Sequence, residues 1–320
     1  MIAILCLLLF EYLYSVKPLE NGLARKPPMG WMSWGYYMCG VNCENNTDKC
    51  LNEELILAVA DKFYNEGYQE AGFEYIIIDD CWSEKERDSN GRLIPDRKRF
   101  PHGMKYIADY IHKLGLKFGM YTNIADVTCM GYPGSRNYFQ IDTKTFAEWD
   151  IDYLKVDGCF VSEDYLNIVL KLIFGAGSLT DSQSRVHVAV YAMLSAPLLL
   201  SCDMNKISIY EKKLLLNLNL IAIAQDDLGI MAKPYSLQHI TLWVKPHLPR
   251  KGDRYHSISF ALVNLNKLNI SVSFTPGIYG LNFTDYSVMD IFSQDIIKNI
   301  SSTDTLTVDI PAEDVILYTA

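Results

Sequence analysis

Two hydrophobic patterns divide the chain. Up to about residue 235, apolar runs typical of buried parallel strands alternate with segments whose apolar residues recur every three or four positions, as on one face of a helix. Strands that alternate with helices predict a parallel sheet with the helices packed outside it. We expect a short aromatic strand ending at Trp34, strands at 74–80, 117–123, 153–156 and 196–201, a weaker candidate strand at 168–174, and helices at 52–64, 101–114, 143–149, 180–194 and 210–217.

The C-terminal part has a different pattern. From about residue 236, apolar and polar residues alternate in short segments separated by turn residues such as Pro276 and Gly277. This alternation is typical of strands with one buried and one exposed face, so we expect an antiparallel β-sandwich over 236–320, with no catalytic constellation of its own. The expected strands are 239–244, 256–264, 269–275, 286–291, 305–309 and 315–318.

The segment 152–159, DYLKVDGC, places charged side chains on one face of a strand. Because side chains alternate along a strand, Leu154 and Val156 face one way, and Lys155 and Asp157 face the other. A lysine is costly to bury without a partner, so this face is expected to line a polar site. The alternative is a plain strand that runs into an Asp-Gly turn.

Polar and aromatic residues collect at the carboxyl ends of four predicted strands. In a (β/α)8 barrel this end carries the active site, because the βα loops open there. Taken singly, two adjacent aspartates are also compatible with a helix cap, and the aromatic residues with a core. Taken together, the pattern predicts one site built from Trp34, Asp79, Asp80, Tyr121, Lys155 and Asp157.

The predicted strands are too few for a complete barrel. A (β/α)8 barrel takes about 250 residues, at about 30 for each βα unit, and the interval before residue 235 has room for fewer than eight units. The fold expected for 17–235 is therefore a (β/α)8 barrel that lacks about three strands. An open parallel sheet leaves unpaired strand edges and an exposed apolar seam.

Composition and charge indicate a globular protein that does not bind nucleic acid. The 320-residue chain is 49% hydrophobic and 21% charged, which suffices to bury a large core. A formal charge of −9 and a pI near 5.2, without a dense basic run, argue against nucleic-acid binding.

Residues 1–10 are apolar but too few to span a bilayer, and we interpret 1–16 as a secretory signal peptide despite its lack of a basic start. We expect no membrane partner and no cofactor for the mature protein.

Cysteines and sequons also indicate the secretory pathway. Apart from Cys6 and Cys202, an even number of cysteines lies in the first half of the chain, which fits three disulfides in an oxidising compartment. A zinc site is a weaker interpretation, because the spacing is not CxxC and no histidine cluster accompanies it. The six cysteines are Cys39, Cys43, Cys50, Cys81, Cys129 and Cys159, and the sequons predict glycosylation at Asn45, Asn269, Asn282 and Asn299.

An ordered set of motifs runs through the chain: NGLARKPPMGWMSW, a C-x3-C-x6-C loop, IIIDDCW, DSNGRLIPDRKRFPHGM, GLKFGMYTN, GYPGS, DYLKVDGC, SAPLLLSCDM and IAIAQDDLG. This set resembles the glycoside hydrolases of the melibiase type, which include the animal lysosomal α-galactosidases and α-N-acetylgalactosaminidases. The resemblance extends over nearly the whole chain from Asn21, although the sandwich matches more by position than by motif.

The resemblance implies a function for the predicted site. Asp157 would be the nucleophile in the hydrolysis of terminal α-linked galactose or N-acetylgalactosamine from glycolipids and glycoproteins, by a retaining mechanism. α-Galactoside-terminated glycans would be the partners, in the lysosome or outside the cell, and the protein would be a homodimer. Implied substrate-binding residues are Trp34, Asp79, Asp80, Tyr121 and Lys155, and implied disulfides are Cys39–Cys81, Cys43–Cys50 and Cys129–Cys159.

The same resemblance exposes a missing part. Retaining glycosidases need a second carboxyl group about 5 Å from the nucleophile, and in this family it is an aspartate on a later barrel strand. Here the interval between DYLKVDGC and SAPLLLS is too short to hold that strand, and the junction is expected between Cys159 and Phe174. The nearest carboxylates along the chain are Glu163 and Asp164, expected in a solvated loop, and Asp181, expected at a helix N-terminus.

Four interpretations remain open at this point. The first is an α-galactoside hydrolase impaired by the missing acid/base. The second is a non-catalytic sugar-binding pseudoenzyme that uses Asp79, Asp80 and Lys155. The third is an incomplete gene model or splice form that does not fold stably. The fourth and weakest is a metal-dependent barrel enzyme that uses Asp79, Asp80 and Asp157.

Overall fold

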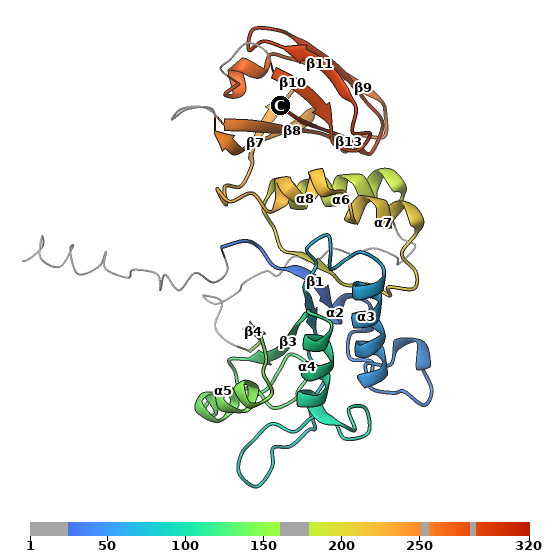
Figure 1. The fold of residues 1–320 in the computed structure, drawn as a ribbon, viewed down its shortest axis with the longest axis vertical. Helices are drawn as coiled ribbons and strands as arrows, with labels where there is room; N and C mark the ends of the chain where they lie inside the picture. Colours follow the sequence, from blue (N-terminus) through green and yellow to red (C-terminus); the bar gives the residue numbers. More distant parts are fainter. Residues whose placement is uncertain (1–24, 161–178, 251–255, 282–285) are drawn as a thin grey trace, which may run out of the picture.

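A five-stranded parallel sheet forms the first half of the molecule. In this computed structural model, which describes residues 25–160, 179–250, 256–281 and 286–320, the strand order is β4-β3-β2-β1-β5 (Figure 1). The strands are β1 (Met29–Met32), β2 (Tyr75–Ile77), β3 (Lys117–Asn123), β4 (Tyr153–Asp157) and β5 (Leu198–Leu200). Since β5 pairs with β1, the last parallel strand lies beside the first, as in a barrel. The sheet is a curled half barrel, and among the described strands β4 and β5 form its edges.

Helices cover the outer face of this sheet, as the apolar pattern predicts. The helices α3 (Glu53–Asn65) and α4 (Gly103–Lys113) pack on β2 and β3, and α5 (Phe139–Glu148) follows β3 along the chain. Asn52 begins α3, where its side chain accepts a hydrogen bond from the Leu55 amide at 2.9 Å. On the inner face, Met32 of β1, Ile77 of β2 and Leu199 of β5 form a small buried cluster of their own.

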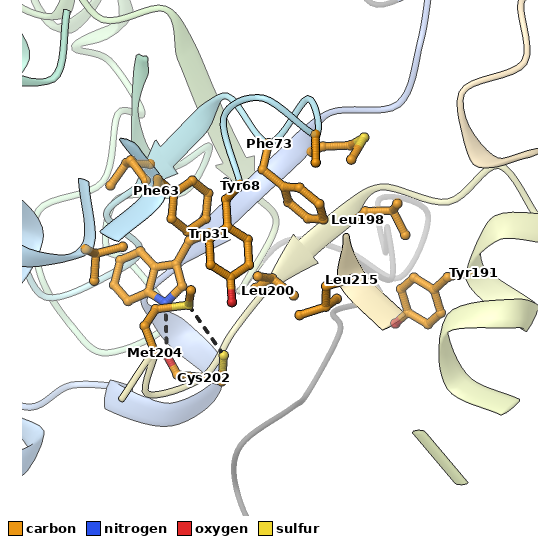
Figure 2. Close-up of a cluster of buried hydrophobic side chains, with 14 of the residues drawn as sticks. Trp31, Phe63, Tyr68, Phe73, Tyr191, Leu198, Leu200, Cys202, Met204 and Leu215 are labelled. Carbon is orange, nitrogen blue, oxygen red and sulfur yellow. Dashed lines mark hydrogen bonds between the residues drawn. The ribbon is translucent and has the colours of Figure 1, made fainter. Parts of the chain in front are cut away.

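An aromatic cluster joins the two ends of the parallel set. Figure 2 shows Trp31 beside Phe63 and Tyr68, with Leu200 of β5 nearby. The Trp31 indole N–H donates to the carbonyl oxygen of Cys202 at 2.9 Å, which satisfies the one polar group of a fully buried side chain. Strand β5 is therefore fixed to β1 by its ladder and by this contact.

Most predicted elements of this half are confirmed to within a few residues. The bounds of β3 are as predicted, whereas α5 starts earlier than expected, at Phe139. The predicted end of the first strand is wrong: β1 stops at Met32, and Trp34 starts the one-turn helix α2 (Trp34–Tyr37), which precedes the short helix η1 (Thr47–Lys49). This turn packs tightly on the end of β5, because a Cβ on Gly35 would lie 2.5 Å from the Ser201 carbonyl oxygen. The candidate strand at 168–174 lies outside the described residues.

Three further helices lie between the parallel sheet and the C-terminal strands (Figure 1). The helices α6 (Asp181–Met193) and α7 (Ile209–Leu215) begin with capping boxes, in which Thr180 and Ser208 each accept from the backbone of the third helical residue. The third helix, α8 (Leu218–Ala224), was not predicted. It is short and apolar on most sides, so it has no helical stripe to detect.

The C-terminal strands form the predicted β-sandwich. A six-stranded antiparallel sheet, in the order β11-β10-β13-β8-β7-β6, faces the pair β12-β9. Alternation along β8 explains both of its contacts: Phe260 and Leu262 enter the sandwich core, whereas Ala261 and Val263 join the core that includes α6. The strands are β6 (Lys233–Leu237), β7 (Ile240–Arg250), β8 (His256–Asn264), β9 (Ile270–Phe274), β10 (Tyr286–Asp290), β11 (Ile296–Ile300), β12 (Leu306–Ile310) and β13 (Asp314–Thr319), with the short helix η3 (Pro276–Tyr279) after β9.

A buried lysine attaches the sandwich to the helical layer. Lys245 of β7 is fully buried, and its Nζ donates to the carbonyl oxygens of Ala192 in α6 and Ile223 in α8 and to Ser195 Oγ. Those carbonyls lie at helix C-termini, where a cation is favoured. Burial lowers the pKa of Lys245 to about 8, which leaves the amine mostly charged at neutral and acidic pH.

Replacing Lys245 by methionine is expected to destabilise the protein by about 1–3 kcal/mol, because buried helix-end carbonyls lose their donor. Urea denaturation followed by circular dichroism measures the change. Lys233→Met is the matched control, since Lys233 is exposed on β6 and its replacement should change stability by less than about 0.5 kcal/mol. Equal stability of Lys245→Met and Lys233→Met would contradict the anchoring role.

The remaining sequence predictions concern targeting and glycosylation. Asn45, Asn269 and Asn299 are exposed, and their glycosylation stays a prediction. Asn282 and the predicted signal peptide at 1–16 lie outside the described residues. None of the helices in the described ranges combines the length and apolar character that crossing a bilayer requires.

Candidate active site

The predicted site residues lie at the carboxyl end of the parallel sheet. Asp79 and Asp80 follow β2, Tyr121 lies in β3, and Lys155 and Asp157 lie in β4. The β3–β4 register pairs Tyr121 with Lys155, so these side chains and that of Asp157, two residues further on, project from the same face. Three strands thus deliver polar side chains to one place.

Lys155 bridges two carboxylates. Its Nζ donates to Asp79 Oδ2 at 2.8 Å and lies 3.7 Å from Asp157 Oδ2. The side chains of Lys155 and Asp79 are only 9% and 2% exposed, whereas that of Asp157 is 30% exposed. A buried ion pair beside a partly open carboxylate presents fixed charges to a polar ligand that enters from solvent.

Asp157 is oriented by hydrogen bonds to both of its oxygens. The Tyr121 hydroxyl donates to Oδ2 at 3.2 Å, and the Gly158 amide donates to Oδ1 at 2.9 Å. Burial, reinforced by the nearby Asp80 and Asp157 charges, raises the pKa of Tyr121, so the phenol stays protonated and acts as a donor. Together with the Lys155 ammonium, which lies 3.7 Å from Oδ2, these donors fix the position of the Asp157 carboxylate.

Asp80 is tied to the loop that follows β3. Its Oδ1 accepts from the Cys81 amide at 2.7 Å and its Oδ2 from the Met130 amide at 3.0 Å, while the Thr128 hydroxyl also donates to it. Burial raises the pKa of Asp80, and these three donors oppose that effect. Sequence reasoning did not single out Thr128. The nearby GYPGS turn was the available signal, because it folds this loop back.

Trp34 occupies a neighbouring position. As the first residue of α2 it lies just past the end of β1, at the same end of the sheet as Asp79. Ser33 links the two elements, because its Oγ accepts from the Asp79 amide at 2.9 Å. Trp34 is partly buried, so it can present part of an indole surface.

Three disulfides cross-link the first half of the chain, and two of them hold loops at this site. The pairs are Cys39–Cys81, Cys43–Cys50 and Cys129–Cys159, which confirms the pairing implied by the resemblance. Cys81 directly follows Asp80, and Cys129–Cys159 joins the loop after β3 to the segment after Asp157. The cross-links therefore restrain the loops that carry Asp80 and Asp157.

The proposed metal ligands are separated by a cation. The Lys155 ammonium lies between Asp79 and Asp157, at the position that a metal shared by these carboxylates would need. The geometry therefore does not favour the metal-dependent interpretation.

The candidate acid/base residues do not gather at this site within the described residues. Asp181 is the first residue of α6, next to the Thr180 cap, as predicted for a helix N-terminus. Glu163 and Asp164 lie outside the described residues. Asp79 accepts from the Lys155 ammonium, and Asp80 accepts from the Cys81 and Met130 amides, so both carboxyl groups already have partners within the protein.

Replacing Lys155 by methionine should cost about 3–5 kcal/mol of stability, because Asp79 would stay buried without its cation. Chemical denaturation measures the effect. Lys117→Met is the control: its partner Glu74 and Lys117 itself are nearly half exposed, so it should cost less than about 1 kcal/mol. A Lys155→Met protein as stable as Lys117→Met would contradict the buried-pair argument.

Comparison with known proteins identifies the family. The family model described as alpha galactosidase A matches residues 26–169 and 164–226, which is more than half of the chain. The α-N-acetylgalactosaminidase of Gallus gallus is 31% identical over 390 positions that cover 94% of each protein. The chain belongs to the alpha-galactosidase A family. Its members among the relatives are glycoside hydrolases named α-galactosidase or α-N-acetylgalactosaminidase.

Other members match this chain over different lengths. Human alpha-galactosidase A is 47% identical over 146 residues, which are 46% of this chain and 34% of that protein. The crystal structure of α-galactosidase I from Mortierella vinacea superposes with a TM-score of 0.81 at 24% identity, covering 94% of this chain and 98% of that one. The α-galactosidase of Saccharomyces cerevisiae gives a TM-score of 0.81 at 21% identity, with 95% and 99% covered. These two structures support the fold alone.

The matches also indicate that this chain lacks part of the alpha-galactosidase A barrel. The family model matches in two pieces that overlap at 164–169, inside the predicted junction between Cys159 and Phe174. The alignment with the Gallus gallus protein has 390 positions but contains about 300 residues of this chain, so about 90 positions lack a residue here. The predicted internal deletion is confirmed.

Proposed function

We propose that this protein binds terminal α-linked galactose or N-acetylgalactosamine and hydrolyses the linkage slowly, by a retaining double displacement in which Asp157 is the nucleophile. The observation that carries the proposal is the partly exposed Asp157 carboxylate, held by Tyr121 and flanked by the buried Lys155–Asp79 pair. A nucleophilic carboxylate must be held facing the substrate, and the Tyr121 hydroxyl and the Gly158 amide fix the orientation of Asp157 by donating to its two oxygens. Family membership supports the substrate class.

The same residues supply sugar recognition in this proposal. Carboxylate oxygens of Asp79 and Asp80 accept hydrogen bonds from ring hydroxyls, and the Lys155 ammonium donates one. The aromatic faces of Trp34 and Tyr121 suit the C–H surface of a hexose. Since Lys155 and Asp79 are already paired in a buried position, little reorganisation is needed on binding.

Slow turnover follows from the deletion. About 90 positions of the alignment with the Gallus gallus protein have no residue here, and we propose that the acid/base of the family is among them. General acid catalysis contributes about 10²–10⁴-fold. A substrate with a good leaving group needs no proton, so it should still form the galactosyl-enzyme. That intermediate should then accumulate, because among the described residues we find no second carboxylate placed to activate the incoming water.

Turnover of a 2,4-dinitrophenyl α-galactoside, with and without azide, tests the proposal. Azide is a strong nucleophile that needs no base, so it should raise the steady-state rate by at least about tenfold and yield α-galactosyl azide. The α configuration of this azide product would show that the anomeric carbon was inverted twice, as a double displacement requires. Failure to release dinitrophenol, by a protein that still binds galactose in calorimetry, would exclude the catalytic proposal.

A second candidate function is a sugar-binding pseudoenzyme. This function is favoured by the hydrogen bonds that Asp79 and Asp80 already make within the protein. Asp157 is then the one candidate nucleophile among the described site residues, whereas several of these residues can bind a sugar. Galactose binding without turnover in the same experiment would establish it. A third alternative, an incomplete gene model or splice form, is tested by sequencing the transcript across 159–174, where an in-frame insert would restore the usual enzyme.

We also propose a compartment and an assembly state. The three disulfides support passage through the secretory pathway, with delivery to the lysosome or release from the cell. The protein is proposed to act on α-galactoside-terminated glycans as a homodimer, by analogy with its family. Light scattering coupled to size-exclusion chromatography tests the dimer, and a monomer mass at micromolar concentration would refute it.

A further inference from the structure

Cys129, Asp157 and Cys159 bring three potential metal-ligand atoms together. The two sulfurs and a carboxylate oxygen all lie within 4.8 Å of one another, and Cys129 Sγ is 3.5 Å from Asp157 Oδ2. Each of the three residues is partly exposed, so solvent and small solutes reach them. In the oxidised protein the sulfurs are bonded to each other and cannot act as thiolate ligands.

We propose that reducing the Cys129–Cys159 disulfide creates a Zn²⁺ site, in which the two cysteine sulfurs and the Asp157 carboxylate coordinate the metal. A dithiol supplies two electrons and two protons: the Cys129–Cys159 bond breaks, two thiols form, and the dithiol closes to its cyclic disulfide. Zn²⁺ then displaces both thiol protons as two Zn–S bonds form. This inference depends on the positions of these three side chains and not on the proposed hydrolysis.

The spacing fits tetrahedral zinc. Zn–S bonds of about 2.3 Å and Zn–O bonds of about 2.0–2.2 Å place neighbouring ligand atoms roughly 3.5–4 Å apart. The Cys129 Sγ to Asp157 Oδ2 distance of 3.5 Å is already in that range. Only the two sulfurs must separate, which side-chain rotation accomplishes once their bond is broken. Three protein ligands leave the fourth position to water.

The surrounding charges also suit the site. Two thiolates and a carboxylate around Zn²⁺ carry a net charge of about −1, which the Lys155 ammonium, 3.7 Å from Asp157 Oδ2, offsets. The Tyr121 hydroxyl lies 3.2 Å from both Cys129 Sγ and Asp157 Oδ2, where it can donate to either ligand. Sulfur ligands select zinc over magnesium or calcium.

Cobalt absorption tests the site directly, because Co²⁺ replaces Zn²⁺ and its thiolate complexes absorb strongly. The full chain is reduced with dithiothreitol, freed of it by anaerobic gel filtration, and titrated with Co²⁺. We expect a thiolate-to-cobalt band that saturates at one equivalent and is displaced by Zn²⁺ but not by Mg²⁺. The oxidised protein should show no band.

Three variants assign the ligands. Cys129→Ser/Cys159→Ser should abolish the band, and Asp157→Asn should weaken Co²⁺ binding at least about tenfold. The matched control, Cys43→Ser/Cys50→Ser, removes another disulfide and should leave the band unchanged. The proposal is overturned by a reduced, folded protein without the band, by a band that survives in Cys129→Ser/Cys159→Ser, or by a reduced chain that unfolds and regains no circular dichroism signal with Zn²⁺.

Discussion

Asp157→Asn is expected to lower azide-assisted turnover of the dinitrophenyl α-galactoside by at least about 10³-fold, or about 4 kcal/mol in activation free energy. The amide keeps the shape of the side chain but is a poor nucleophile, so no galactosyl-enzyme forms for azide to intercept. Sugar binding should persist, because Lys155 and Asp79 retain their pairing. Stopped-flow release of dinitrophenol and calorimetric titration with galactose separate the two effects.

Asp126→Asn is the matched control for this substitution. Asp126 lies on the loop after β3, its side chain is 66% exposed, and it pairs only across the surface with Arg136. The same chemical change there should leave turnover within about twofold, because exposed pairs contribute little. An Asp157→Asn protein that keeps its rate would show that another group attacks the sugar.

Restoring the missing segment should increase activity by about 10²–10⁴-fold on alkyl α-galactosides, whose poor leaving groups require a general acid. The change replaces residues 161–178 with the corresponding longer segment of the Gallus gallus relative, which fills the roughly 90 unmatched positions. New strands would also pair with the edges of β4 and β5, so the melting temperature should rise. Kinetics on alkyl and aryl substrates, with calorimetry, measure both effects.

The control for this chimera is the same insert with its acid/base aspartate changed to asparagine. That protein should gain the thermal stability but not the rate on alkyl substrates. A chimera that melts higher and still shows no gain in rate would mean that the deletion is not what limits catalysis.

The site was predictable from sequence because strand alternation is strict. The run Leu154, Lys155, Val156, Asp157 admits one assignment of faces, and the structure places Lys155 and Asp157 on the face shared with Tyr121. The alternation of side chains along the strand could not predict which residue pairs with Lys155. The Asp79 contact joins residues 76 positions apart, and it depends on how β2 and β4 flank β3.

Elements without a clear hydrophobic pattern were the ones missed. β6 and β11 are mostly exposed, so neither shows the alternation that a half-buried strand acquires from its neighbours. Trp34 was placed in a strand because its aromatic neighbours favour one, yet the close approach of Gly35 to Ser201 bends the chain into α2. Tertiary packing decided that boundary, and local propensity did not.

The edge position of β4 has a consequence for how firmly Asp157 is held. Among the described strands, β1 and β2 each have a neighbour on both sides, whereas β4 hydrogen-bonds to β3 alone. Local opening is easiest where fewest backbone bonds must break, so the amides of β4 should exchange with deuterium sooner than those of β2. The strand that carries the proposed nucleophile is thus one of the two edge strands, where fraying is easiest, and the Cys129–Cys159 disulfide limits how far its end can move.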